Sequence, residues 1–227
     1  MSYEDTKKKF MKYCETVCTH STLTKVCKDI IWLKAFEYRQ IALNLKMEER
    51  KKKQGIITDL SEEMDQIEKE SRQIQKTYSS HELDKIKECQ EILELIYEEG
   101  FHDVLGELFS SLRALNRDYS QIFTPYHVSH LMASLSMDPA IEKEDYKIYD
   151  PYCGSGSLLI AQAEVLSSRG IELDKICLIG NDIDRFCVAM TYVQFCEYGL
   201  CGMVSCEDAL QNDPQEFWET PALIARC

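Results

Sequence analysis

Apolar residues in the first hundred positions recur three and four residues apart, as they do on the buried face of a helix. This spacing predicts one long helix from Thr22 to about Lys53 and a second, shorter helix after it. A third helix is expected from Ser79, because Glu82 stands three residues further on and completes a capping-box signal. Residues 1–100 are therefore expected to form a helical bundle or a coiled-coil hairpin.

Two interpretations of this helical region stay open. It is either a subdomain that only packs on its neighbour or an arm that contacts a partner or DNA. Solvated charged faces are the usual outcome of such a pattern, and they favour the first interpretation.

After Gly100 the pattern changes to short β-forming segments that alternate with helices. Strands are predicted at Tyr146–Tyr149, Lys175–Ile179 and Met203–Cys206, and a helix at Arg185–Tyr198. Strands that alternate with helices form parallel sheets. The fold class is therefore α/β, with a helical N-terminal region followed by a partial Rossmann-like domain of three parallel strands in residues 101–227.

Carboxylates and glycines gather where these strands end. Asp150 is followed by Gly154 and Gly156, and the next two strands lead to Asp182 and Asp208. The carboxyl ends of parallel strands are where open α/β sheets bind ligands. Acids at all three turns suit a ligand with a cationic amino-acid group, a ribose diol and an adenine, which describes S-adenosylmethionine. The sequence contains neither the P-loop nor the dinucleotide glycine fingerprint.

Charge and cysteine content narrow the picture further. Residues 1–100 carry 18 basic and 20 acidic side chains, whereas residues 101–227 carry 8 and 19, so the second part has a net charge of −11 and should repel DNA when alone. The eleven cysteines include no Cys-x-x-Cys pair, and His127 and His130 have no third ligand nearby, so no metal site is expected. No apolar run approaches the ~18 residues of a membrane span, and no secretion signal precedes the helices, so the cytoplasm is the expected compartment.

Four segments occur in an order that resembles the N6-adenine DNA methyltransferases. They are Gln121-Ile122-Phe123-Thr124-Pro125, Asp150-Pro151-Tyr152-Cys153-Gly154-Ser155-Gly156-Ser157, Gly180-Asn181-Asp182-Ile183-Asp184 and Glu207-Asp208-Ala209-Leu210. The chain is most similar in this respect to the modification subunit of type I restriction systems, and the resemblance covers about residues 101–210.

The resemblance implies a role for nine residues in binding S-adenosylmethionine. Phe123 and Thr124 would hold the methionine end. Asp150, Gly154 and Ser155 would form the floor beneath it.

The remaining four residues would bind the nucleoside end. Asp182 would bind the ribose hydroxyls, with Ile183 against the adenine. Asp208 would accept from the adenine amino group, unless it is only a helix cap, and Ala209 would offer a backbone donor.

The catalytic loop of the family is absent from this sequence. Family members grip the flipped adenine with an Asn/Asp-Pro-Pro-aromatic loop after a fourth strand, and no Pro-Pro occurs here. Asp213-Pro214 is the nearest approach, and it follows Asp208 too closely to leave room for a fourth strand. No catalytic residue is therefore assigned, and the C-terminal tail with Trp218 is expected to cover the edge beside the first strand or to contact a partner.

Three functions are compatible with these features. The chain is the donor-binding part of a DNA adenine methyltransferase of the restriction-modification type, which methylates DNA only with a specificity subunit or a second methyltransferase subunit. Alternatively it is a non-catalytic S-adenosylmethionine-binding accessory or regulatory module. The third possibility is a divergent methyltransferase that acts on RNA or a small molecule.

Overall fold

The computed structural model describes residues 2–52, 60–115, 122–136, 145–210 and 216–226. The chain divides into two compact units, Met1–Glu99 and Gly100–Cys227. The two units are described separately below.

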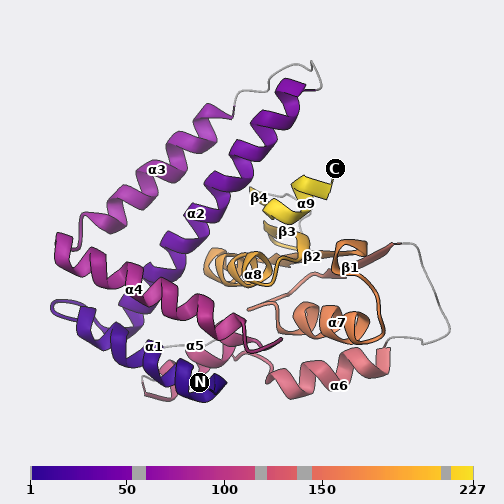
Figure 1. Cartoon of the computed structure of the whole chain (residues 1–227), viewed down its shortest axis with the longest axis horizontal. Coiled ribbons are helices and arrows are strands. Elements are labelled where there is room, and N and C mark those ends of the chain that lie inside the picture. Colours follow the sequence, from indigo (N-terminus) through magenta and orange to yellow (C-terminus); the bar gives the residue numbers. More distant parts are fainter. Residues whose placement is uncertain (1, 53–59, 116–121, 137–144, 211–215, 227) are drawn as a thin grey trace. The chain divides into compact units, whose positions relative to one another are not determined.

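The first unit is a helical bundle (Figure 1). Helix α1 packs on α4, and α2 packs on both α3 and α4. The helices are α1 (Tyr3–Val17), α2 (Leu23–Lys52), α3 (Ser61–Gln75) and α4 (Ser80–Tyr97). Helix α1 was not predicted, although its buried residues Phe10, Cys14 and Val17 follow helical spacing.

The apolar seam of α3 packs against α2. Ile67 is buried with Phe36 and Leu43, and Met64 and Ile74 of the same seam pack beside them. Tyr78 lies beyond the end of the helix at Gln75 and donates its hydroxyl to Asp29 Oδ2 at 2.6 Å.

The predicted capping box at the start of α4 is confirmed. The Ser79 hydroxyl accepts from the Glu82 amide at 3.4 Å, and Glu82 Oε2 accepts from the Ser79 amide at 2.8 Å. A hydroxyl from Thr19 also donates to the Glu82 carboxylate. These donors lower the pKa of Glu82 to about 2, with the Thr19 hydroxyl as the largest cause.

Replacing Ser79 with alanine should destabilise the helical unit by about 1 kcal/mol, because a helix N-cap that loses its side-chain acceptor costs about that much. Urea unfolding followed by circular dichroism measures the change. Ser80→Ala is the matched control, since Ser80 is exposed in the first turn of α4. An equal loss in both variants would contradict the role of the cap.

The second unit is a sheet with helices (Figure 1). Its helices are α5 (Val104–Leu115), α6 (Tyr126–Ser136), α7 (Ser157–Ser168), the 3-10 turn η1 (Leu173–Lys175), α8 (Arg185–Glu197) and α9 (Pro221–Arg226). Its strands are β1 (Tyr146–Asp150), β2 (Ile176–Asp182), β3 (Cys201–Cys206) and β4 (Glu216–Glu219). The strand order is β1-β2-β3-β4.

Strands β1, β2 and β3 are parallel, as predicted. A fourth strand, β4, was not predicted; it pairs with β3 and follows Asp213-Pro214, so the expectation that no strand fits between Asp208 and Asp213 is not contradicted. This pairing is antiparallel, and antiparallel strands need no crossover helix between them, so a short connection is enough.

The C-terminal tail was expected either beside β1 or against a partner, and the first of these alternatives is wrong. Trp218 pairs with Val204 of β3, at the opposite edge of the sheet. The Thr220 hydroxyl then accepts from the Gly202 amide at 3.1 Å and donates to the Leu200 carbonyl at 2.9 Å, which fixes the start of α9.

The two faces of the sheet are covered by helices to different extents. On one face the Trp218 ring meets Tyr192 of α8 edge-on at 5.4 Å between centroids, and a side chain at Gly202 would lie 2.8 Å from the Phe195 ring. On the other face Tyr149 is 56% exposed and Phe217 48% exposed. Helix α8 therefore packs closely on the face of the sheet that carries Trp218 and Gly202.

Candidate functional site

The glycine turn after β1 is held by the end of β2. The Cys153 amide donates to the Asn181 carbonyl at 2.8 Å. Gly154 and Gly156 have φ angles of 57° and 89°, a region that favours glycine. Helix α7 begins directly after Gly156, so its first amide groups face the turn.

Asp182 locks this turn in place. Its Oδ2 accepts from the Gly154 amide at 2.9 Å, and its Oδ1 accepts from the Asp184 amide at 2.9 Å. Burial raises the pKa of the Asp182 carboxyl, and these two amide donors oppose that shift. Each carboxylate oxygen can accept a second hydrogen bond, so a ligand hydroxyl can still bind there.

Asn181 joins the turns that follow three strands. Its side-chain amide donates to the Pro151 carbonyl at 3.2 Å and to the Glu207 carbonyl at 3.3 Å, and its oxygen accepts from the Ser205 hydroxyl at 3.1 Å. The side chain is fully buried. Asn181 had been assigned no role from the sequence, although it stands inside the quoted acidic segment.

The segment before α6 lies against the glycine turn and the start of α7. The Ser157 hydroxyl lies 3.3 Å from the Thr124 carbonyl and 2.9 Å from the Ser129 hydroxyl, which joins the start of α7 to α6. The Phe123 ring lies next to Gly154, where an added side-chain carbon would be 3.5 Å away.

These elements enclose a cavity of about 140 Å³. It is lined by Ile122, Phe123, Thr124, Ser129, Met132, Asp150, Tyr152, Cys153, Gly154, Ser155, Ser157 and Leu158. Five of the nine predicted site residues thus line one cavity.

The other four predicted residues do not line the cavity. Asp182 accepts a hydrogen bond from Gly154, which does line the cavity, and the adjacent Ile183 is 73% exposed. The Asp208 Oδ1 accepts from the Leu210 amide at 3.0 Å, and Ala209 lies within the turn that this bond closes. Gln121 and Asp213-Pro214 lie outside the described residues.

Asp103 lies behind the cavity wall and had no predicted role. Its carboxylate accepts from the Ser155 hydroxyl at 2.6 Å and from the Gln194 side-chain amide at 2.8 Å. Ser155 therefore directs its hydroxyl toward Asp103. The signal in the sequence is an Asp-x-x-Gly segment at the start of α5, in which Gly106 donates to Asp103.

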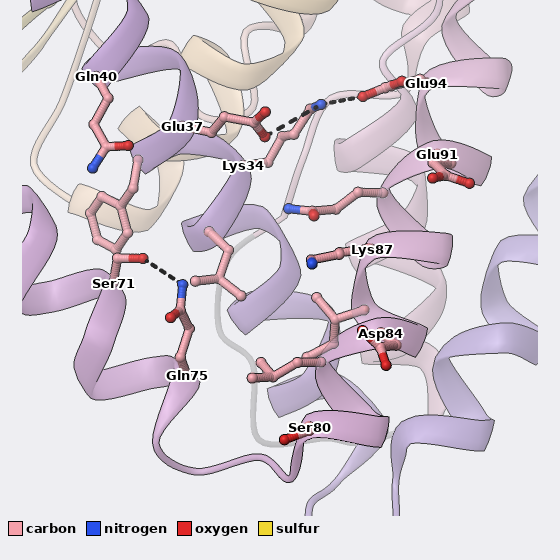
Figure 2. Close-up of a pocket in the computed structure, with 15 residues that line it drawn as sticks. Lys34, Glu37, Gln40, Ser71, Gln75, Ser80, Asp84, Lys87, Glu91 and Glu94 are labelled. Carbon is pink, nitrogen blue, oxygen red and sulfur yellow. Dashed lines mark hydrogen bonds and ion pairs between the residues drawn. The ribbon is translucent and has the colours of Figure 1, made fainter.

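A larger hollow of about 640 Å³ lies within the helical unit, between α2, α3 and α4 (Figure 2). Its buried cation, Lys34, already pairs with Glu94 and with Glu37 at 3.8 Å. None of the nine predicted residues lies in this hollow. Among the described residues, no group of three His, Cys, Asp or Glu is placed to hold a metal, and no helix is long and apolar enough to cross a membrane.

Comparison with known proteins confirms the resemblance seen in the sequence. A family model described as N-6 DNA Methylase matches residues 100–218. The methylase subunits of the type I restriction enzymes MjaVIII and MjaIX of Methanocaldococcus jannaschii are 29% identical over 108 residues and 24% identical over 93 residues. These matches cover 46% and 41% of this chain, but only 17% and 16% of the relatives' length.

A solved structure with a similar fold is the methyltransferase subunit of a type I restriction-modification system from Streptococcus thermophilus. The TM-score is 0.53 at 11% identity, over 95% of this chain and 61% of that one. The similarity places the fold among the methyltransferases.

Proposed function

Because the chain belongs to the N-6 DNA methylase family, we propose that it binds S-adenosylmethionine as the donor part of an N6-adenine DNA methyltransferase of the restriction-modification type. The observation that carries the proposal is the cavity in which Phe123 and Thr124 meet the glycine turn after β1. Most of its residues come from two of the segments that resemble the family, those around Phe123 and around Gly154.

The volume of the cavity indicates that it holds only one part of the cofactor and that the rest binds outside it. A volume of about 140 Å³ is below the roughly 300–1,000 Å³ of sites that enclose a whole ligand. We place the methionine end in the cavity, over Gly154 and beside Asp150. The ribose then lies at Asp182, and the adenine lies over the exposed Ile183 toward Asp208 and Ala209.

The acceptor part of the reaction is supplied from elsewhere. The 227 residues contain no Pro-Pro-aromatic loop, and residues 101–227 carry a net charge of −11, which opposes DNA binding. We propose that DNA contacts and the adenine-gripping loop come from further chain or from a second subunit. The cytoplasmic location stays a prediction from the sequence.

Titration calorimetry of S-adenosylmethionine against the full chain, paired with tritiated-methyl transfer to unmethylated DNA, tests this function. Binding without transfer is the expected result. Transfer by the chain alone would contradict the missing acceptor part, and an absence of binding would contradict the donor site. The same pair of measurements separates a donor half from an accessory module, because only a donor half gains transfer when the complementary methylase subunit is added.

A further inference from the structure

The buried carboxylate of Asp103 connects three elements of the second unit. It stands directly before α5, and its partners come from α5, from the glycine turn and from α8. The residue is 1% exposed. Burial raises the pKa of the Asp103 carboxyl, and the hydrogen bonds from Ser155, Gln194 and the Gly106 amide oppose that shift.

Each oxygen of Asp103 has a defined use. Oδ1 accepts from the Gly106 amide at 3.0 Å and from Gln194 Nε2 at 2.8 Å, and Oδ2 accepts from the Ser155 hydroxyl at 2.6 Å. The Gly106 and Gln194 groups are N–H donors, and the Ser155 hydroxyl is placed to donate to Oδ2. Burying a charged group without such partners would be strongly unfavourable.

The same network also holds the backbone of the glycine turn. Gln194 Nε2 donates to the Ser155 carbonyl at 2.7 Å, and Gln194 Oε1 accepts from the Leu105 amide at 3.2 Å. Ser155 lines the cavity, and its hydroxyl is bound to Asp103. Asp103 therefore holds the Ser155 hydroxyl, and Gln194 holds the Ser155 carbonyl.

The packing around Gly106 is consistent with a carboxylate held in one position. A side-chain carbon at Gly106 would lie 2.0 Å from Asp103 Oδ2 and 2.6 Å from the Ser155 hydroxyl. Contacts this short do not occur, so any larger residue would displace the carboxylate.

From this network we propose that Asp103 is a positioning residue for the donor site: it holds Ser155, and with it the glycine turn, in the geometry that binds the methionine end of the cofactor. The proposal rests on the proposed function. It goes beyond the ordinary role of an N-cap, which Asp103 also performs for α5 through Gly106.

Asp103→Asn separates the two roles. Asparagine caps helices about as well as aspartate, so α5 keeps its cap. One oxygen becomes an NH₂ group: beside Gln194 Nε2 it faces another donor and that hydrogen bond is lost, and beside Ser155 it reverses the hydrogen bond, so that the Ser155 hydroxyl must accept. We expect S-adenosylmethionine affinity to fall at least about tenfold in calorimetry, and Gly106→Ala, which leaves the carboxylate but displaces it, should lower affinity in the same direction.

Thr220→Val is the matched control. Thr220 is also fully buried in the second unit and also makes three hydrogen bonds, to Gly202, Leu200 and Leu223. This variant should lower the melting temperature while leaving cofactor affinity unchanged. Equal affinity in wild type and Asp103→Asn would overturn the proposal, as would an equal loss of affinity in Thr220→Val.

Hydrogen exchange of the cofactor-free chain provides a readout that does not depend on the proposed function. Peptides that cover residues 150–160 should exchange faster in Asp103→Asn, and in the milder Ser155→Ala, than in wild type and Thr220→Val. Unchanged exchange would overturn the positioning role. If the wild type fails to bind the cofactor while exchange behaves as expected, the proposed function fails and the structural role of Asp103 stands.

Discussion

Replacing Asp182 with alanine should weaken S-adenosylmethionine binding by about 100-fold, or about 2.8 kcal/mol at about 1.4 kcal/mol for each factor of ten. The carboxylate holds the Gly154 amide at 2.9 Å, so its loss frees the glycine turn. It also removes the acceptor that we assign to the ribose hydroxyls. Hydrogen bonds to charged groups contribute about 1.5–3 kcal/mol each, which sets the size of the effect. Titration calorimetry measures it.

Asp184→Ala is the matched control for this prediction. Asp184 stands two residues away, and its Oδ1 caps α8 by accepting from the Phe186 amide at 2.8 Å. Loss of that cap should lower stability by about 1 kcal/mol and leave affinity within a few-fold of wild type. If Asp184→Ala weakens binding as much as Asp182→Ala, the ribose assignment is wrong.

Trp218→Ala should destabilise the second unit by about 3–5 kcal/mol, the usual cost of truncating a buried tryptophan. The ring is 2% exposed, packs on Tyr192, and lies 5.7 Å from the Arg185 guanidinium carbon. Urea unfolding of the full chain, followed by tyrosine and tryptophan fluorescence and by circular dichroism, measures the loss.

Phe217→Ala provides the comparison at the neighbouring position. Phe217 occupies the same strand but is 48% exposed on the opposite face. Its truncation should cost less than about 1.5 kcal/mol, because burial of a whole side chain is worth about 1.5–3 kcal/mol and only part of this one is buried. Similar losses at both positions would show that β4 does not pack as described.

The features that the sequence predicted are those with short-range signals. Ser79 and Glu82 are three residues apart, and they form the expected capping box. The strand that ends at Asp150 has its own run of β-forming residues, and β1 is found there. Parallel pairing then follows because a helix separates each of these strands from the next.

The features that the sequence did not predict depend on distant partners. Strand β4 is four residues long, and its pairing with β3, not its own propensity, makes it a strand. Asp103 is separated from Ser155 by 52 positions and from Gln194 by 91, so no local pattern connects them. Asp182 had been assigned to the ligand alone, whereas both its oxygens also hold backbone amides.

Strand β4 also determines how molecules of this kind can associate. Its backbone occupies the outer edge of β3, from Met203–Glu219 to Cys206–Glu216. Within the described part of the chain β1 pairs with β2 alone and β4 pairs with β3 alone, so the sheet keeps one open edge at β1 and another at β4. The β4 edge is only four residues long, and such short edge strands limit edge-to-edge pairing between molecules.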